Sequence, residues 1–372
     1  MKIGVLFVMM LASGFLATAQ MDHHFGPLDP RPPRIPEEKT FSSSSIAGYI
    51  KEHYHEEKER VRVAYNWVAA NIRYDRDSML SINWSKNNAD KIAATLRRKK
   101  GVCDNFASVF TDILLKMNIP SFVVNGLAKG DGKDLAHSWS AVQLANEWYL
   151  CDPTWDAGFS NKGRYFLIAP AEFIASHWPF DPLWQLLKKP YSLPEFEKGF
   201  SAGNKKEVFP NLADSVKQFL LLDSLQQLEA TSARMRAIGL EQKSLQTWYA
   251  YNNMNIAIIY GEQDMNLYNA AVADLNKANT YLNEFINYRN NFFKPIRDDQ
   301  AIRNMLQPIT GLINAAMQKM EAIGKLRENF QYDTGFLKER LKTMNSKLEQ
   351  QNNFLNRYMQ SSVADRETIF YN

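Results

Sequence analysis

Two residues that could carry out nucleophilic catalysis stand where a secondary-structure element is expected to begin. Cys103 follows Gly101-Val102 at the predicted start of a helix, and His137 opens a predicted strand. Backbone N–H groups and the positive end of the helix dipole favour a thiolate at a helix N-terminus. A thiolate also needs a base or counter-ion, and imidazole is the usual one. The pattern therefore predicts a cysteine nucleophile served by His137.

The charges beside Cys103 act in both directions. The basic run Arg97-Arg98-Lys99-Lys100 lies just upstream and would add positive potential at the thiol, whereas Asp104 directly after it would oppose a thiolate. Opposite charges stabilise an ionised group and like charges destabilise it. We expect the basic run to be the stronger influence only if Asp104 is not close to the sulfur.

The third candidate is Asp152, at the end of the strand that follows His137. Side chains alternate along strands, and directly paired residues share a face. With an even number of residues in the loop between strands 137–144 and 147–152, His137 and Asp152 lie on one face. They are then opposite or diagonal to one another, within side-chain reach. Nucleophile, base and base-orienting acid are thus all supplied, and Cys151 lies on the other face.

Other interpretations of the same residues stay open. Taken one at a time, Cys103 and Cys151 are small apolar side chains suited to a core, and His137 is a strand residue with a hydrogen-bond partner. The two cysteines could also form a disulfide if the protein is exported, although the facing argument opposes that pairing. The combination of all three residue types at these positions favours the triad.

The elements around these residues follow an α+β order. Apolar residues recur at helical spacing in three early segments, at residues 56–72, 89–96 and 103–117. Short β-type runs follow at residues 121–124, 137–144, 147–152 and 165–168. Gly126, Gly130 and Gly132 indicate a flexible loop between the first two of these strands. Helices followed by antiparallel strands are typical of an α+β domain.

Beyond about residue 200 the strand signals stop and helical seams replace them. Ile302, Leu306, Ile309 and Ile313 are one example of apolar residues in a sustained 3,4 rhythm, and similar seams occur on either side. Such seams are typical of helices packed lengthwise. Breaking residues at Gly239, Gly261, Pro295 and Gly335 divide the region. We expect an all-α bundle of four or five antiparallel helices.

The N-terminus predicts export. Lys2, an apolar run over 3–16 and the small residues Ala17-Thr18-Ala19 have the order of a signal peptide, and the run is too short to span a bilayer. An uncleaved membrane anchor is the alternative. The proposed organisation is a signal peptide over 1–19, a Pro/Ser-rich linker over 20–44, an enzyme-like domain over 45–205 and a helical bundle over 206–372. The mature protein is expected to be periplasmic or extracellular, with no membrane span.

Composition excludes several classes of protein. The 372 residues carry a net charge of only +4, too weak a bias to indicate nucleic acid as a partner. Two cysteines exclude a disulfide-rich scaffold and a four-cysteine zinc site. No nucleotide-binding signature occurs, and His53 and His55 point apart on a helix. We therefore expect neither a cofactor nor a metal.

The sequence resembles the transglutaminase-like superfamily of papain-like thiol enzymes over roughly residues 45–200. The resemblance is carried by four motifs, Ile72-Arg73-Tyr74-Asp75, Lys100-Gly101-Val102-Cys103-Asp104-Asn105-Phe106-Ala107, His137-Ser138-Trp139 and Trp148-Tyr149-Leu150-Cys151-Asp152-Pro153-Thr154-Trp155. It implies a papain/transglutaminase-like core with a triad of Cys103, His137 and Asp152. The segment from His177 to Gln185 resembles the kyphoscoliosis-peptidase-like branch, which implies a binding or packing role for His177.

The resemblance also bears on residues around the triad. An oxyanion hole needs a second donor beside the Cys103 backbone N–H, and Trp84 is the candidate. Trp139 is a candidate for a substrate groove, with core packing as the alternative for both tryptophans. No acidic cluster resembles the calcium sites of animal transglutaminases, so no calcium dependence is expected.

Two functions from different classes follow. The first is an exported cysteine enzyme that acts on protein or peptide amide bonds through an acyl-thioester, with hydrolysis favoured over transamidation. The second is a non-catalytic binding or assembly module that uses the same fold and the helical domain. The expected partners are a protein or peptide substrate and, through the helical domain, another protein or a second copy of the chain.

Overall fold

The computed structural model describes residues 34–77, 88–130, 134–157, 163–199, 207–323 and 334–371. They form two compact units. The first extends to Asp223 and also includes Ala230–Trp248; the second comprises Ser224–Glu229 and the chain from Tyr249 onward. The predicted signal peptide, most of the predicted linker and Trp84 lie outside the described residues.

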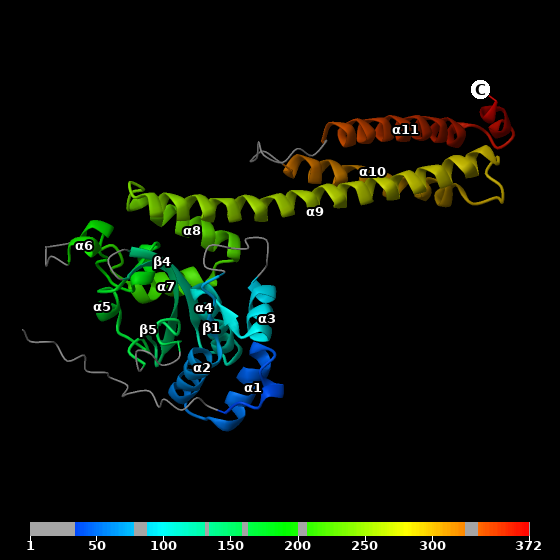
Figure 1. Cartoon of the computed structure of the whole chain (residues 1–372). Coiled ribbons are helices and arrows are strands. Elements are labelled where there is room, and N and C mark those ends of the chain that lie inside the picture. The colour runs from blue at the N-terminus through cyan, green and yellow to red at the C-terminus, as the bar shows by residue number, and fades with distance from the viewer. Residues whose placement is uncertain are drawn as a thin grey trace, which may run out of the picture. The chain divides into compact units, whose positions relative to one another are not determined.

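Helices open the first unit in the predicted order. They are η1 (Glu37–Lys39), α1 (Ser43–His53), α2 (Glu57–Asn71), α3 (Asn88–Arg98) and α4 (Cys103–Lys116) (Figure 1). The serine run assigned to the linker begins α1 instead, because the Ser42 hydroxyl accepts a hydrogen bond from the Ser45 N–H at 3.1 Å. Serine is a favoured N-cap residue, so this polar tract starts a helix rather than preceding the domain.

A curled antiparallel sheet follows, with strand order β5-β4-β3-β6. Its strands are β3 (Ser121–Lys129), β4 (Asp134–Leu144), β5 (Glu147–Cys151) and β6 (His177–Pro179), and a two-stranded parallel pair joins β1 (Arg73–Tyr74) to β2 (Lys100–Gly101). The prediction of a loop at Gly126 is wrong: this glycine lies within β3. A Cβ there would come within 2.2 Å of the Trp178 carbonyl and 2.6 Å of the Trp139 ring, so only glycine fits between the strands.

Helix α4 carries Cys103 at its start and supplies core side chains along its length. Phe106, Phe110, Ile113 and Leu114 are fully buried and belong to one apolar cluster with α1, α2 and β4. A buried helix of this kind gains its stability from packing, and it holds its first residue at a fixed place beside the sheet.

The first unit reaches further along the chain than residue 205. It continues through α5 (Pro170–Phe173), η3 (Pro182–Gln185), α6 (Leu193–Lys198) and α7 (Leu212–Leu221). Phe219 of α7 packs edge-on against Phe122 at 5.5 Å and Trp184 at 5.7 Å between ring centroids. In α8 (Ser224–Ala237), Arg234 makes a bidentate ion pair with Asp181, with N–O distances of 2.6 and 2.7 Å. These contacts add residues after 205 to the core of the first unit.

Long helices make up the second unit, as predicted, but its described residues form three long helices and not the expected four or five. They are α9 (Lys243–Asn290), α10 (Asp299–Ala322) and α11 (Thr334–Gln360), followed by η4 (Arg366–Phe370). Residues of α9, α10 and α11 share one apolar cluster, and the three helices run lengthwise beside one another (Figure 1). The break predicted at Gly261 is wrong, since this residue lies within α9. A single glycine costs a helix only about 1 kcal/mol relative to alanine, which the packing of a 48-residue helix outweighs.

None of the described helices is long and apolar enough to cross a membrane.

Candidate active site

Cys103 is the first residue of α4 and is partly exposed. The turn before it is fixed by Asn105, whose side-chain oxygen accepts from the Val102 N–H at 2.9 Å and whose amide donates to the Thr95 hydroxyl at 2.8 Å. A Cβ on Gly101 would lie 2.5 Å from the Asn105 side chain, so the glycine makes this capping contact feasible. The sequence Gly-Val-Cys-Asp-Asn thus places the thiol at a helix N-terminus.

The charges near Cys103 are arranged differently from the sequence expectation. Lys91 pairs with Asp104 at 2.5 Å, which reduces the opposition of that carboxylate to a thiolate. Arg98 and Lys100 both bind the buried Asp75, at 3.0 and 2.8 Å. Lys99 lies over the Trp67 ring at 4.6 Å. Three members of the basic run are therefore engaged with other groups, and the groups beside the thiol are the start of α4 and the His137 imidazole.

His137 and Asp152 meet through the predicted strand register. The loop between β4 and β5 has two residues, since Leu144 pairs with Glu147, and Ser140 pairs with Cys151. This register puts Asp152 diagonal to His137 on one face, and His137 Nε2 lies 2.7 Å from Asp152 Oδ2. The other carboxylate oxygen accepts from the backbone N–H of Thr154 at 2.9 Å and, at 3.3 Å, from that of Trp155. The turn after β5 thus fixes the carboxylate that orients the imidazole.

A buried tyrosine supports the same turn from α2. The Tyr65 hydroxyl lies 2.9 Å from the Asp152 carbonyl oxygen and 2.6 Å from Asp156 Oδ2. Both carboxylates are fully buried, and burial raises the pKa of Asp156. The helix therefore holds the backbone of Asp152 in place.

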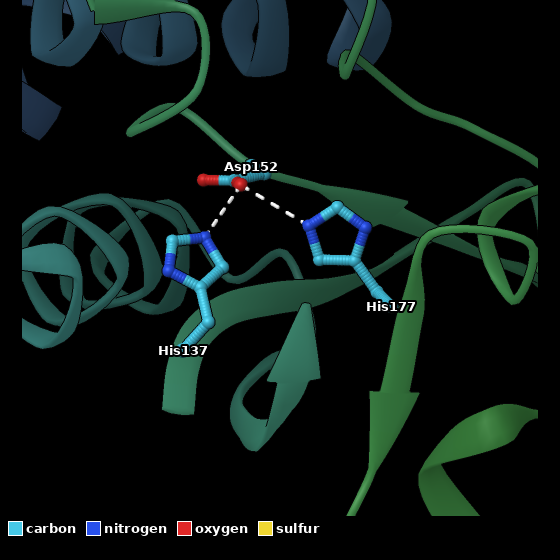
Figure 2. Close-up of side chains that lie close together, drawn as sticks. All are labelled: His137, Asp152 and His177. Atoms are coloured by element: carbon cyan, nitrogen blue, oxygen red, sulfur yellow. Dashed lines mark hydrogen bonds and ion pairs between the residues drawn. The ribbon is translucent and has the colours of Figure 1, made fainter. Parts of the chain in front are cut away.

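His177 of β6 is a second imidazole on the same carboxylate; the sequence indicated a binding or packing role for it but not this contact. Its Nε2 lies 3.3 Å from Asp152 Oδ2, the oxygen that His137 also contacts, and Figure 2 shows both rings directed at it. Gly126 pairs with His137 and Ala128 with His177, so only small residues of β3 separate the two rings. A signal existed in the sequence, because the His177 segment was among the motifs of the resemblance.

The pKa values of His137, Asp152 and His177 are shifted in different directions. Burial alone would lower the pKa of His137, but the charge and hydrogen bond of Asp152, followed by those of Cys103, raise it to about 10. Burial opposes ionisation of Asp152, yet the two histidines hold its pKa well below its usual range. Burial lowers the pKa of His177 to about 4, against the opposing hydrogen bond and charge of Asp152. The same carboxylate thus raises the pKa of one imidazole, whereas burial lowers that of the other.

The two cysteines are free thiols in contrasting surroundings. Cys103 contributes a side-chain hydrogen bond and a charge interaction to His137, and its charge also raises the pKa of Tyr74, after the larger effect of burial. Tyr74 is a neighbour of the thiol that sequence reasoning did not single out. Cys151 is fully buried on the opposite face from His137, where burial raises its pKa far above the usual range. The geometry places one thiol beside His137 and isolates the other.

The two tryptophans named from the sequence have different outcomes. Trp139 is fully buried and packs against Phe173 and His177, at 5.8 and 5.0 Å between ring centroids. It is a core residue beneath the imidazoles, because a side chain without exposed surface cannot line an open groove. Trp84 lies outside the described residues, so its oxyanion role stays a prediction.

Within the described residues, His137, Asp152 and His177 form a group of side chains that could hold a metal ion. Ligand atoms of His137, Asp152 and His177 all lie within 4.8 Å of one another. The 2.7 Å contact between His137 and Asp152 is, however, a hydrogen-bond distance with a proton between the two atoms. The arrangement is accounted for by imidazole–carboxylate hydrogen bonds, and the absence of a cofactor stays a prediction.

Comparison with known proteins identifies the part of the chain that carries these residues. Residues 44–153 match the transglutaminase-like superfamily. The chain is 34% identical to mouse kyphoscoliosis peptidase over 172 residues, covering 41% of this chain and 26% of the relative. It is 24% identical over 172 residues to hillarin of Drosophila melanogaster, covering 37% and 20% of the two chains. The match thus spans about a quarter of the length of these relatives.

Two solved structures are also similar in part. One is a putative cysteine protease from Cytophaga hutchinsonii, at 18% identity and a TM-score of 0.25, covering 31% of this chain and 39% of that one. The other is the periplasmic domain of TgpA from Pseudomonas aeruginosa bound to ethylmercury. It has 18% identity and a TM-score of 0.26, covering 36% and 50% of the two chains.

Proposed function

We propose that the protein is an exported thiol enzyme that acts on protein or peptide amide bonds, and the match of residues 44–153 to the transglutaminase-like superfamily supports this. Cys103 is the nucleophile, His137 the general base and acid, and Asp152 the residue that orients His137. The observation that carries the proposal is the position of His137. Its Nε2 binds Asp152 at 2.7 Å, and the ring also interacts with the thiol of Cys103.

The first half of the reaction forms a thioester. With Nε2 engaged by Asp152, Nδ1 is the ring nitrogen that takes the proton of Cys103. The thiolate attacks the amide carbonyl, and the backbone N–H groups at the start of α4 stabilise the oxyanion. The C–N bond then breaks as His137 returns the proton to the departing amine. The result is an acyl-thioester on Cys103 and a free amine.

The second half decides between hydrolysis and transamidation. His137 removes a proton from water, which attacks the thioester and releases a carboxylic acid and the Cys103 thiol; an amine in place of water gives a new amide. Hydrolysis is the favoured outcome, since water is always available.

Covalent labelling tests the proposal. The full chain is treated with a peptide that carries a thiol-reactive vinyl sulfone, and intact mass is measured. Wild type and Cys151→Ala are expected to gain one probe mass, and Cys103→Ala none. Labelling of Cys103→Ala at the wild-type rate contradicts the proposal. The wild type is then incubated with a casein substrate and a fluorescent primary amine. New carboxyl ends indicate hydrolysis, and incorporated amine indicates transamidation.

Export is part of the same proposal and has its own test. It is supported by the order of charge, apolar run and small residues over residues 1–19. N-terminal sequencing of the protein from its native cells should give a chain that begins near Gln20. A chain that retains residues 1–19 argues for an anchored protein.

A further inference from the structure

The second imidazole at Asp152 has no part in the reaction described above. We propose that His177 is a positioning residue: as a neutral donor it shares Asp152 Oδ2 with His137 and so limits how strongly Asp152 holds the proton on His137. This inference rests on the proposed function, since it concerns the same base.

The hydrogen-bond directions around His177 follow from its two neighbours. Ser176 Oγ lies 2.8 Å from Nδ1, and Asp152 Oδ2 lies 3.3 Å from Nε2. A carboxylate can only accept, so Nε2 carries the proton. The Ser176 hydroxyl has two acceptors within reach, Nδ1 at 2.8 Å and the Phe173 carbonyl oxygen at 3.4 Å, and the shorter contact assigns its proton to Nδ1. A ring with one donor and one acceptor is the neutral form. Its complete burial lowers its pKa to about 4 and keeps it neutral at physiological pH.

The fold holds this ring rigidly. His177 stacks on Phe173 at 4.1 Å and lies against Trp155 at 4.4 Å between ring centroids. Its backbone is paired to Ala128 of β3. The ring therefore cannot turn away from Asp152 without disturbing the sheet, and it fixes the carboxylate on the side that the Thr154 and Trp155 N–H groups leave open.

Sharing one oxygen between two donors weakens each bond relative to an unshared one. The titratable groups that face the two rings are Cys103 from α4, Asp152 after β5 and Tyr165 in the segment before α5. Of these, only Asp152 contacts both imidazoles. Removing the His177 donor leaves the whole charge of Oδ2 to His137, which then releases its proton to the leaving amine less readily.

The first measurement determines which nitrogen of His177 carries the proton. The chain has six histidines, so a ¹⁵N-histidine-labelled sample gives a sparse spectrum, and the His177 signals are assigned by their loss in His177→Gln. The expected result at pH 7 is a neutral ring protonated on Nε2. Protonation on Nδ1 alone, or on both nitrogens, overturns the proposal.

The second measurement follows the deprotonation midpoint of His137 by the same spectra. His177→Phe keeps a ring but removes the donor, and it is expected to raise the midpoint by roughly half to one pH unit, the equivalent of one neutral hydrogen bond. His177→Gln, whose amide can donate, should return the midpoint toward wild type. Phe173→Leu is the control, because it alters packing on His177 without removing the donor, and it should leave the midpoint unchanged.

Equal midpoints in folded wild type, His177→Phe and His177→Gln contradict the proposal, as does a shift of the same size in Phe173→Leu. The readout does not require Cys103 to react. A shifted midpoint together with an unlabelled Cys103 would therefore leave this inference standing and reject the proposed function.

Discussion

The buried surroundings of Asp152 and the core of the second unit contain opposite kinds of residue. Around Asp152, the first unit buries Asp156 and His177, whose side chains each make a hydrogen bond with another polar side chain. In the described part of the second unit the buried polar side chains are Asn252, Asp264 and Gln351, and the shared core of α9, α10 and α11 is almost wholly apolar. Buried polar groups destabilise a core unless they are partnered, so a dense, partnered cluster is the more informative signal of chemistry.

The largest effects are expected in the polar cluster. His137→Ala removes the base and should lower turnover by about 10³-fold or more, and Asp152→Asn should approach this because the amide stabilises imidazolium poorly. The double variant should lose little more than either single one, since the residues act as a unit. Turnover of a cleaved amide substrate is the measurement, with circular dichroism as the check on folding.

Asp134→Asn is the matched control for that prediction. Asp134 lies at the start of β4, near His137 in sequence, but strand parity does not place it on the face of His137. Its substitution should therefore lower turnover only mildly. A folded Asp152→Asn protein with wild-type turnover removes Asp152 from the site. A severe loss of turnover in Asp134→Asn would assign the orientation of His137 to Asp134 instead.

The border between the units gives the next prediction. A protein ending at residue 205 lacks Phe219, which covers Phe122 and Trp184 in the first unit. It should aggregate or unfold without cooperativity, whereas a protein of residues 34–248 retains α7 and the Arg234 partner of Asp181 and should be monomeric. Size-exclusion chromatography and thermal unfolding compare the two. A soluble, cooperative 34–205 protein would place the border where the sequence first suggested.

A change confined to the apolar region should affect stability and spare the chemistry. Leu306→Ala removes a buried side chain of α10 and should destabilise the second unit by about 3 kcal/mol. Met317→Ala, at a 44% exposed position of the same helix, is the control and should cost far less. Denaturant unfolding measures both, and turnover should be unchanged. Loss of turnover in Leu306→Ala would show that the two regions are coupled.

The two histidines predict a smaller effect, on the pH dependence of stability. In the unfolded chain both titrate near 6.5. The folded value of about 4 for His177 means that the unfolded state binds more protons between pH 4 and 6.5, so stability falls as pH drops through this window. For His137 the folded value of about 10 makes its contribution complete below 6.5 and lost as pH rises to 10. His177→Gln should flatten the acid side of a plot of melting temperature against pH, and His137→Gln the alkaline side; the reverse assignment contradicts the account.

Local pattern in the sequence predicted most of the elements and part of the site. Periodicity located α2, α4 and the seams of the second unit because each has an apolar face that must be buried. Strand parity placed His137 beside Asp152 because a two-residue loop fixes the register. These inferences depend only on neighbouring residues, which explains their success.

The remaining features depend on tertiary packing. His177 reaches Asp152 through β6, a three-residue strand whose position is set by pairing with β3 and not by its own composition. Gly126 suggests a loop in isolation, but the close approach of Trp139 and the Trp178 carbonyl requires it in a strand. Gly261 suggests a helix break, but this residue is buried within the continuous helix α9. For His177 and Gly126 the outcome was decided by a partner far away in the sequence.

The central claim is that Cys103, and not Cys151, is a thiol activated by His137. The most direct test is the rate of alkylation of each cysteine in the folded full chain at neutral pH, followed by peptide mapping after short exposure to iodoacetamide. Cys103 should react much faster than the buried Cys151, and His137→Ala should slow Cys103 strongly without changing Cys151. Equal rates for the two thiols, or a Cys103 rate that is unaffected by His137→Ala, would contradict the account.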